Sequence, residues 1–172
     1  MTSVPAVAVA FSPVTLLFGP SVAYNVAALL LPTLAAWTAF LLCRYVTRST
    51  WASIVGGYLY GFSSFVLGHQ LGGHLNLTAT FVIPLAALAV LRYMRGDIGG
   101  GGLLWRLSAI LAFEAYTSTE LSLTLALMAA AAFVLAFAIL PASRARLVSA
   151  LPWVAGSYAI AAVLAAPLGN VE

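Results

Sequence analysis

Charge is scarce in this sequence of 172 residues: Asp, Glu, Lys and Arg together make up 6% of it, and it contains no lysine. A typical soluble domain carries about 25% charged residues. Hydrophobic residues instead make up 63% of the chain. This composition excludes a soluble globular domain and a disordered tail, and it indicates a polytopic membrane protein.

Cysteine and the common catalytic motifs are also scarce or missing. The single Cys43 cannot form a disulfide within the chain, which excludes a disulfide-stabilised secreted fold. The sequence contains no HExxH zinc motif, no CxxC pair and no dinucleotide-binding glycine motif. The glycines at 99–102 lack the Lys-Ser/Thr of a phosphate-binding loop. We therefore expect no cofactor and no metal site in this chain, and the absence of a basic amphipathic surface argues against a nucleic-acid partner.

Apolar runs fill most of the chain. A transmembrane helix needs about 20 apolar residues to cross the hydrocarbon core of a bilayer. Seven runs, separated by Gly, Pro or Arg, approach this length: 4–18, 22–43, 51–67, 75–93, 103–116, 121–140 and 147–168. The sequence therefore predicts an all-α transmembrane bundle of about seven helices, which forms a single domain over residues 1–172.

The arginines predict the orientation of this bundle. If the seven runs cross the membrane in turn, every arginine falls on the same side, and cytoplasmic loops are the ones that carry excess positive charge. The N-terminus is therefore expected on the cytoplasmic side. The arginines are Arg44, Arg48, Arg92, Arg95, Arg106, Arg144 and Arg146.

The outer loop after the third run is the most polar stretch of the chain. It contains His69, Gln70, His74 and Asn76 together with three glycines that allow a tight turn. One interpretation is a site for an anionic head group such as a lipid phosphate, which the side chains and exposed backbone N–H groups would bind. A second is a metal-binding histidine pair, although no third ligand is near. A third is an interfacial turn whose polar groups meet water.

Two acidic residues fall at the outer end of the fifth and sixth runs. Glu114 lies within the fifth run, where an ionisable group usually faces a bundle interior or a wet cavity. Glu120 follows Thr117 by three residues, a spacing that fits a helix capping box. Either carboxylate could instead act as a base or bind a sugar hydroxyl.

Small residues and prolines predict local packing. Gly57 and Gly61 are one helical turn apart, which lets membrane helices approach closely, either within the chain or with a partner. Pro32 and Pro84 lie within the second and fourth runs and predict kinks.

Several short motifs occur in an order that resembles a known group of proteins. They are Phe18-Gly19-Pro20, Tyr24-Asn25, Gly56-Gly57-Tyr58, Tyr60-Gly61-Phe62-Ser63, Gly68-His69, Gly73-His74-Leu75-Asn76-Leu77 and Ile83-Pro84-Leu85. This order resembles bacterial multi-pass membrane proteins of the GT-C glycosyltransferase type, including YfhO-like and mannosyltransferase-like proteins. The resemblance covers mainly residues 11–95, and more loosely residues 103–140.

The resemblance implies a glycosyltransferase of the bacterial plasma membrane that takes a sugar from a polyprenyl-phosphate donor on the extracytoplasmic face. In such enzymes a catalytic acid, commonly Asp, lies in the first outer loop, but here that loop is only Gly19-Pro20. We therefore expect an internal fragment of a longer chain. The remaining helices of that chain would supply the acid and would bind any divalent metal that the full enzyme uses. His69 and His74 match the family's histidine loop as walls of the site.

Within this chain, Glu114 and Glu120 are the local candidates for the catalytic base, and His69, Gln70, His74 and Asn76 for donor binding. Membrane lipid and the lipid-linked sugar are then the expected partners. Two other functions stay open: a transporter or channel that uses the two glutamates along its pathway, and a non-catalytic assembly subunit that pairs through Gly57 and Gly61.

Overall fold

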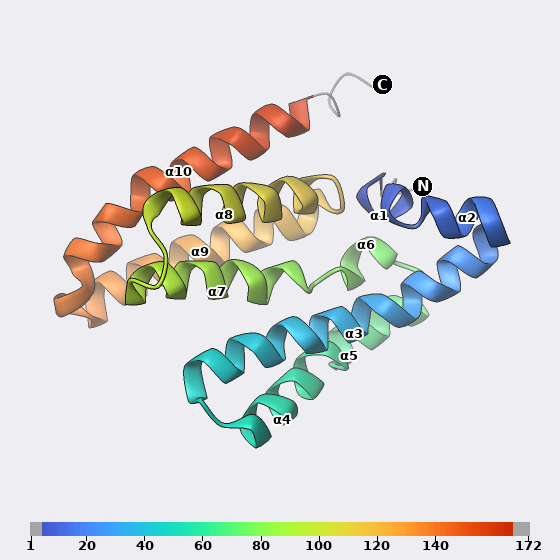
Figure 1. The fold of residues 1–172 in the computed structure, drawn as a ribbon, viewed down its shortest axis with the longest axis horizontal. Coiled ribbons are helices and arrows are strands. Elements are labelled where there is room, and N and C mark those ends of the chain that lie inside the picture. The colour runs from blue at the N-terminus through green and yellow to red at the C-terminus, as the bar shows by residue number, and fades with distance from the viewer. Residues whose placement is uncertain (1–4, 167–172) are drawn as a thin grey trace. The chain divides into compact units, whose positions relative to one another are not determined.

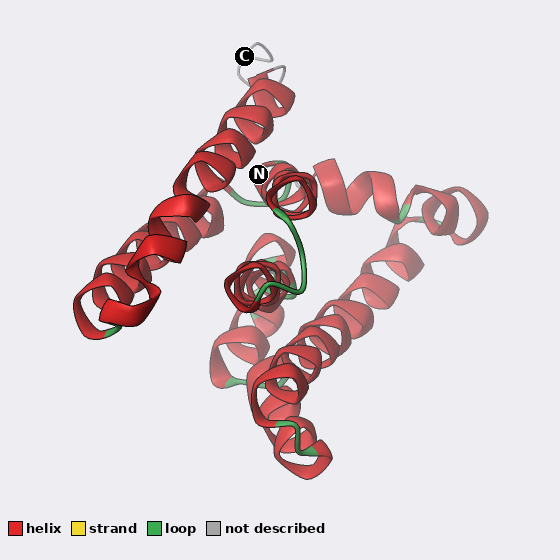
Figure 2. Ribbon diagram, turned by 60° about the vertical axis from the view of Figure 1, so that its left-hand side comes forward, coloured by secondary structure: helices red, strands yellow, loops and turns green. Residues whose placement is uncertain are grey.

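The structure is a computed structural model that describes residues 5–166, and within this range every regular element is a helix (Figure 2). The all-α prediction is therefore confirmed. The predicted run 4–18 begins before the described residues, and the predicted run 147–168 ends after them. The elements are α1 (Pro5–Ala10), α2 (Ser12–Phe18), α3 (Pro20–Thr47), α4 (Thr50–Gly61), α5 (Ser64–Leu71), α6 (Leu75–Thr78), α7 (Val82–Arg95), α8 (Gly100–Ala115), α9 (Thr119–Ile139), the 3₁₀ helix η1 (Pro141–Ser143) and α10 (Arg144–Ala165).

Four helical segments of the described chain are long and apolar enough to cross a membrane. They are Pro20–Thr47, Leu75–Arg95, Thr119–Ile139 and Pro141–Ala165. Two other predicted runs are each divided into shorter helices, since Phe11 separates α1 from α2 and Ser63 caps a new helix after α4. The four segments fit a membrane protein, whereas a total of seven crossings and a cytoplasmic N-terminus stay predictions.

The chain forms two compact units, Met1–Leu88 and Ala89–Glu172. In the first unit, α4 and α5 run back along α3 (Figure 1). A Cβ atom added to Gly57 would lie 2.6 Å from the Ala36 oxygen, and one added to Gly61 would lie 2.6 Å from the Pro32 oxygen. The two glycines therefore allow α4 to pack directly on the α3 backbone, which is the close helix approach that their spacing predicts. This contact within the chain occupies the face that an assembly subunit would offer to a partner.

The helical segment that contains Pro84 is interrupted shortly before this residue. A continuous helix from Leu75 to Arg95 would need the Pro84 N–H as a donor to the Thr80 oxygen, and proline has none. The helix is interrupted between α6 and α7, and the Thr80 oxygen instead accepts hydrogen bonds from the Ile83 N–H at 3.2 Å and the Tyr60 hydroxyl at 3.0 Å. Pro84 thus lies in the first turn of α7, a position that proline tolerates well.

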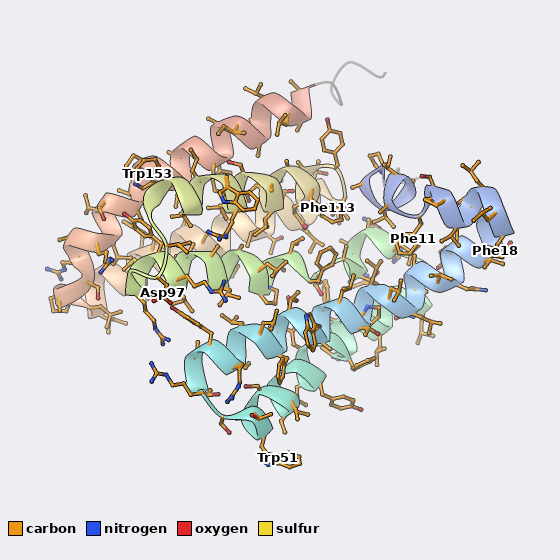
Figure 3. The ribbon with its side chains drawn as sticks, in the orientation of Figure 1. Phe11, Phe18, Trp51, Asp97, Phe113 and Trp153 are labelled. Carbon is orange, nitrogen blue, oxygen red and sulfur yellow. The ribbon has the colours of Figure 1, made fainter. Side chains whose placement is uncertain are left out.

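In the second unit, α8 and α10 run in the same direction, side by side. Trp153 of α10, labelled in Figure 3, lies directly against Gly100 at the start of α8. Further along, the Ser157 hydroxyl donates to the Leu104 oxygen at 3.2 Å. Beyond the end of α8, the Tyr116 hydroxyl donates to the Leu164 oxygen at 2.6 Å. The α9 helix connects the two and accordingly runs in the opposite direction.

Two arginine-bearing connections meet at one end of this second unit. A Cβ atom added to Gly96, between α7 and α8, would lie 2.7 Å from Nη2 of Arg146, near the start of α10. The Tyr93 hydroxyl also donates to the Ser149 oxygen at 3.1 Å. This arrangement agrees with a common membrane side for the arginines of both connections.

The α9 helix is apolar along most of its length and exposes most of its side chains. None of the residues in its most apolar 18-residue window is buried, and the mean hydropathy of that window is 2.4. A helix that is apolar on every side is typical of a membrane span rather than of a soluble protein surface. The length and exposed apolar surface of α9 therefore fit a membrane-spanning helix.

Candidate functional site in the turn between α5 and α6

The turn between α5 and α6 brings together the polar residues of the predicted outer loop. Ser63 begins α5 by accepting a hydrogen bond from the Val66 N–H, and α5 ends at Leu71. Gly73 then adopts a φ of +75°, a left-handed conformation that glycine enters without steric cost. The His74 N–H donates to the His69 oxygen at 2.9 Å, which closes the turn. The glycines of this loop thus serve the tight turn that the sequence predicts.

The same turn places the two histidine side chains next to each other. Their ring centroids are 5.7 Å apart, with an angle of 64° between the ring planes. The His69 ring also packs edge-on against Phe65, with centroids 4.5 Å apart. His69 is half-buried and His74 is exposed. One imidazole is therefore held by packing, and the other is exposed beside it.

Tyr24 of α3 belongs to this site, although its position in the sequence did not mark it as a site residue. A Cβ atom added to Gly73 would lie 3.7 Å from the Tyr24 hydroxyl oxygen, so the phenol reaches the turn between the two histidines. Tyr24 is 42% exposed, so part of its side chain is accessible at the surface. The signal for Tyr24 in the sequence is its place in the Tyr24-Asn25 motif of the resemblance.

Gln70 lies in the same turn but its amide nitrogen points to α3. Nε2 donates to the Ala28 oxygen at 2.8 Å, a contact across 42 positions of the sequence. Its Oε1 atom is buried and has no hydrogen-bond partner in the described structure. The amide donor that the sequence assigns to a head group is therefore already engaged by the backbone.

Asn76 differs from the histidines in its surroundings. It lies in α6 and is 7% exposed, so it faces the interior of the first unit. His69, His74 and Tyr24 are the site residues that a ligand at the surface of the turn would meet first.

The two candidate acids belong to the second unit and have contrasting environments. Glu114 is fully buried, and neither of its carboxylate oxygens has a hydrogen-bond partner among the described residues. Glu120 is exposed in the first turn of α9. A carboxylate without partners is costly to bury, whereas one near a helix N-terminus is stabilised by the helix dipole. Glu120 is the one that is accessible to a reacting group.

The prediction of a capping box from the spacing of Thr117 and Glu120 is wrong. Ser118 is the N-cap of α9, because its hydroxyl accepts a hydrogen bond from the Leu121 N–H at 3.3 Å. The Thr117 hydroxyl instead donates to the Phe113 oxygen at 2.8 Å, in the preceding helix. A serine next to a threonine leaves two candidate caps, and the sequence alone favoured the one that completes the motif.

The described part of the chain contains no group of three or more His, Cys, Asp or Glu side chains arranged to hold a metal ion. Comparisons with protein-family models, with curated proteins and with solved structures found no match for this chain. The turn itself offers two imidazoles and a phenol, those of His69, His74 and Tyr24. These are hydrogen-bond donors suited to an anionic oxygen ligand.

Proposed function

We propose that this chain is a membrane-embedded part of a glycosyltransferase that uses a polyprenyl-phosphate-linked sugar, and that the turn between α5 and α6 binds the phosphate of the donor. The observation that carries the proposal is the 5.7 Å separation of the His69 and His74 rings, with the Tyr24 hydroxyl beside Gly73. These three side chains can donate hydrogen bonds to one phosphate group.

The location of the turn supports the proposal. Gly57 of α4 lies against Ala36 of α3, and Gly73 lies against Tyr24, so the turn is at the opposite end of α3 from Arg44 and its neighbours. If the arginine end is cytoplasmic, the turn is on the extracytoplasmic side. A lipid phosphate has its chain in the bilayer and its charge at the interface, which is where such a turn would meet it.

The transfer step would need a base for the acceptor. The acceptor oxygen forms a bond to the anomeric carbon of the sugar while the bond from that carbon to the donor phosphate oxygen breaks. The acceptor proton passes to a carboxylate, and polyprenyl phosphate leaves with the bonding electrons. Glu120 is exposed, whereas Glu114 is buried, so Glu120 is our candidate for that role beside any acid supplied by further helices.

Titration in lipid nanodiscs tests the binding step. The chain has only two histidines, so ¹³Cε1-histidine labelling gives two NMR signals. A polyprenyl phosphate should shift both signals, whereas the corresponding polyprenol, which lacks the phosphate, should not. Replacing both histidines by alanine should weaken binding, measured by native mass spectrometry, by about a hundredfold or more. Each hydrogen bond to a charged group contributes about 1.5–3 kcal/mol, and about 1.4 kcal/mol corresponds to a factor of ten.

Leu71→Ala is the matched control, because Leu71 lies between the histidines and its side chain is 92% exposed. This variant should bind the polyprenyl phosphate like the unchanged protein. In the protein that contains this chain, the double alanine variant should lower sugar transfer without lowering membrane abundance. Equal binding of the phosphate and the alcohol, or unchanged binding by the double variant, would remove the turn from the donor site.

A transporter is the second candidate, and one observation favours it. The buried carboxyl of Glu114 has no partner among the described residues, and such a group in a membrane protein often marks an ion or proton pathway. Proton flux into proteoliposomes that is present for the unchanged chain and absent for Glu114→Gln would favour this function over sugar transfer.

A further inference from the structure

The α3 helix contains a carbonyl that its own backbone cannot satisfy. Pro32 lies inside α3 and has no N–H, so the oxygen four residues earlier, that of Ala28, lacks its usual helical donor. In the apolar interior of a membrane no water replaces it, and an unpaired backbone oxygen is costly there. Nε2 of Gln70 donates to this oxygen at 2.8 Å.

We propose that Gln70 is a positioning residue for the turn between α5 and α6: its amide replaces the N–H that Pro32 removes from α3 and thereby fixes His69 and His74 against that helix. Gln70 directly follows His69 in α5, so this bond holds the residue next to the half-buried imidazole. The use of this turn to bind a lipid phosphate rests on the proposed function, but the positioning of the turn by Gln70 does not.

Other contacts show that the hydrogen bond from Gln70 to Ala28 positions the turn and not only α5. Tyr24 is one helical turn before Ala28, so both residues face the same side of α3. The Tyr24 hydroxyl lies near Gly73 while the Ala28 oxygen accepts from Gln70, so α3 holds the turn at two points. The orientation of the amide is also fixed, because the Ala28 oxygen can only accept and must face Nε2.

A double-mutant cycle with Pro32→Ala and Gln70→Met tests the proposal in the full chain. Methionine keeps the length of glutamine and removes the donor, whereas alanine in place of Pro32 returns a backbone N–H to the Ala28 oxygen. We expect Pro32→Ala to raise the folding equilibrium constant about tenfold more in the Gln70→Met variant than in the unchanged chain, because only the variant has an unpaired oxygen to rescue. An equal effect in both backgrounds would overturn the link between Pro32 and Gln70.

The two histidine NMR signals report the positioning itself, without any ligand. Gln70→Met should shift both signals. Adding Pro32→Ala should not restore them, because it gives the Ala28 oxygen a backbone donor but does not restore the hydrogen bond between Gln70 and α3. Tyr60→Phe is the matched control: it removes the comparable bond from the Tyr60 hydroxyl to the Thr80 oxygen, away from the turn. It should lower stability and leave both histidine signals in place.

Histidine signals that do not respond to Gln70→Met would overturn the positioning role even if the cycle shows coupling. Because these signals are measured before any lipid is added, the result is separate from the proposed function. A turn that is positioned by Gln70 but does not bind polyprenyl phosphate would refute only the latter.

Discussion

The contact between α3 and α4 leads to a prediction for Gly61→Ala. The added Cβ atom would lie 2.6 Å from the Pro32 oxygen, about 0.8 Å short of the 3.4 Å at which ordinary contact begins. Because the neighbour is backbone, α4 has to move away from α3. Overpacking of this kind costs about 1–3 kcal/mol, and the higher helix propensity of alanine offsets about 0.5–1 kcal/mol of it.

Gly68→Ala is the matched control, because Gly68 lies inside α5 with nothing within 4 Å of an added Cβ atom. It should gain the propensity term alone, so the two variants should differ by about 1–3 kcal/mol in free energy of unfolding. Unfolding in mixed micelles by titration with a denaturing detergent measures this difference. Equal stabilities for Gly61→Ala and Gly68→Ala would show that α4 does not pack on the α3 backbone at this position.

Three further predictions concern topology, burial and capping. Leu71 is 92% exposed, and nothing lies within 4 Å of a Cβ atom added to Gly99. In a background without the native cysteine, single cysteines at these two positions should react with impermeant thiol reagents from opposite sides of the membrane. Reaction of both from the same side would contradict the arginine-based orientation. Glu114→Leu should raise thermal stability, because it removes two buried oxygens without partners, each costing about 1–3 kcal/mol; a loss of stability would indicate a basic partner. Ser118→Ala should cost about 1 kcal/mol in chemical unfolding and Thr117→Ala less, and the reverse order would restore Thr117 as the cap of α9.

The fold class could be predicted from the sequence because composition dominates it. A chain with 63% hydrophobic residues and 6% charged residues cannot form a soluble surface, and membrane-spanning structure has to satisfy its backbone internally, which favours helices. The interruptions of the helices were harder to predict. The run 51–67 is apolar throughout most of its length, yet Ser63 caps a new helix within it, because one hydroxyl can satisfy backbone donors with little effect on the hydropathy of the run.

The candidate site was predictable where its residues are close in sequence. His69 and His74 are separated by a glycine turn, so local spacing brings their rings together. Tyr24 comes from α3, more than forty positions earlier, and only the antiparallel packing of α3 against α4 and α5 brings its hydroxyl to Gly73. Spacing of polar residues within one loop carries no information about a contact of that kind.

Gln70 shows why polar residues in a membrane protein are easily assigned to the wrong partner. In the sequence it stands beside a histidine in a glycine-rich loop, which favours a ligand-binding role. Its actual acceptor is created by Pro32, since a proline within a helix removes the donor for the oxygen four residues earlier. In water that oxygen would be hydrated, but in the apolar interior of a membrane a polar side chain can replace the missing donor, as Gln70 does here. A proline inside a long apolar run is therefore a reason to look for a distant Gln, Tyr or Arg donor before a polar residue is assigned to a substrate.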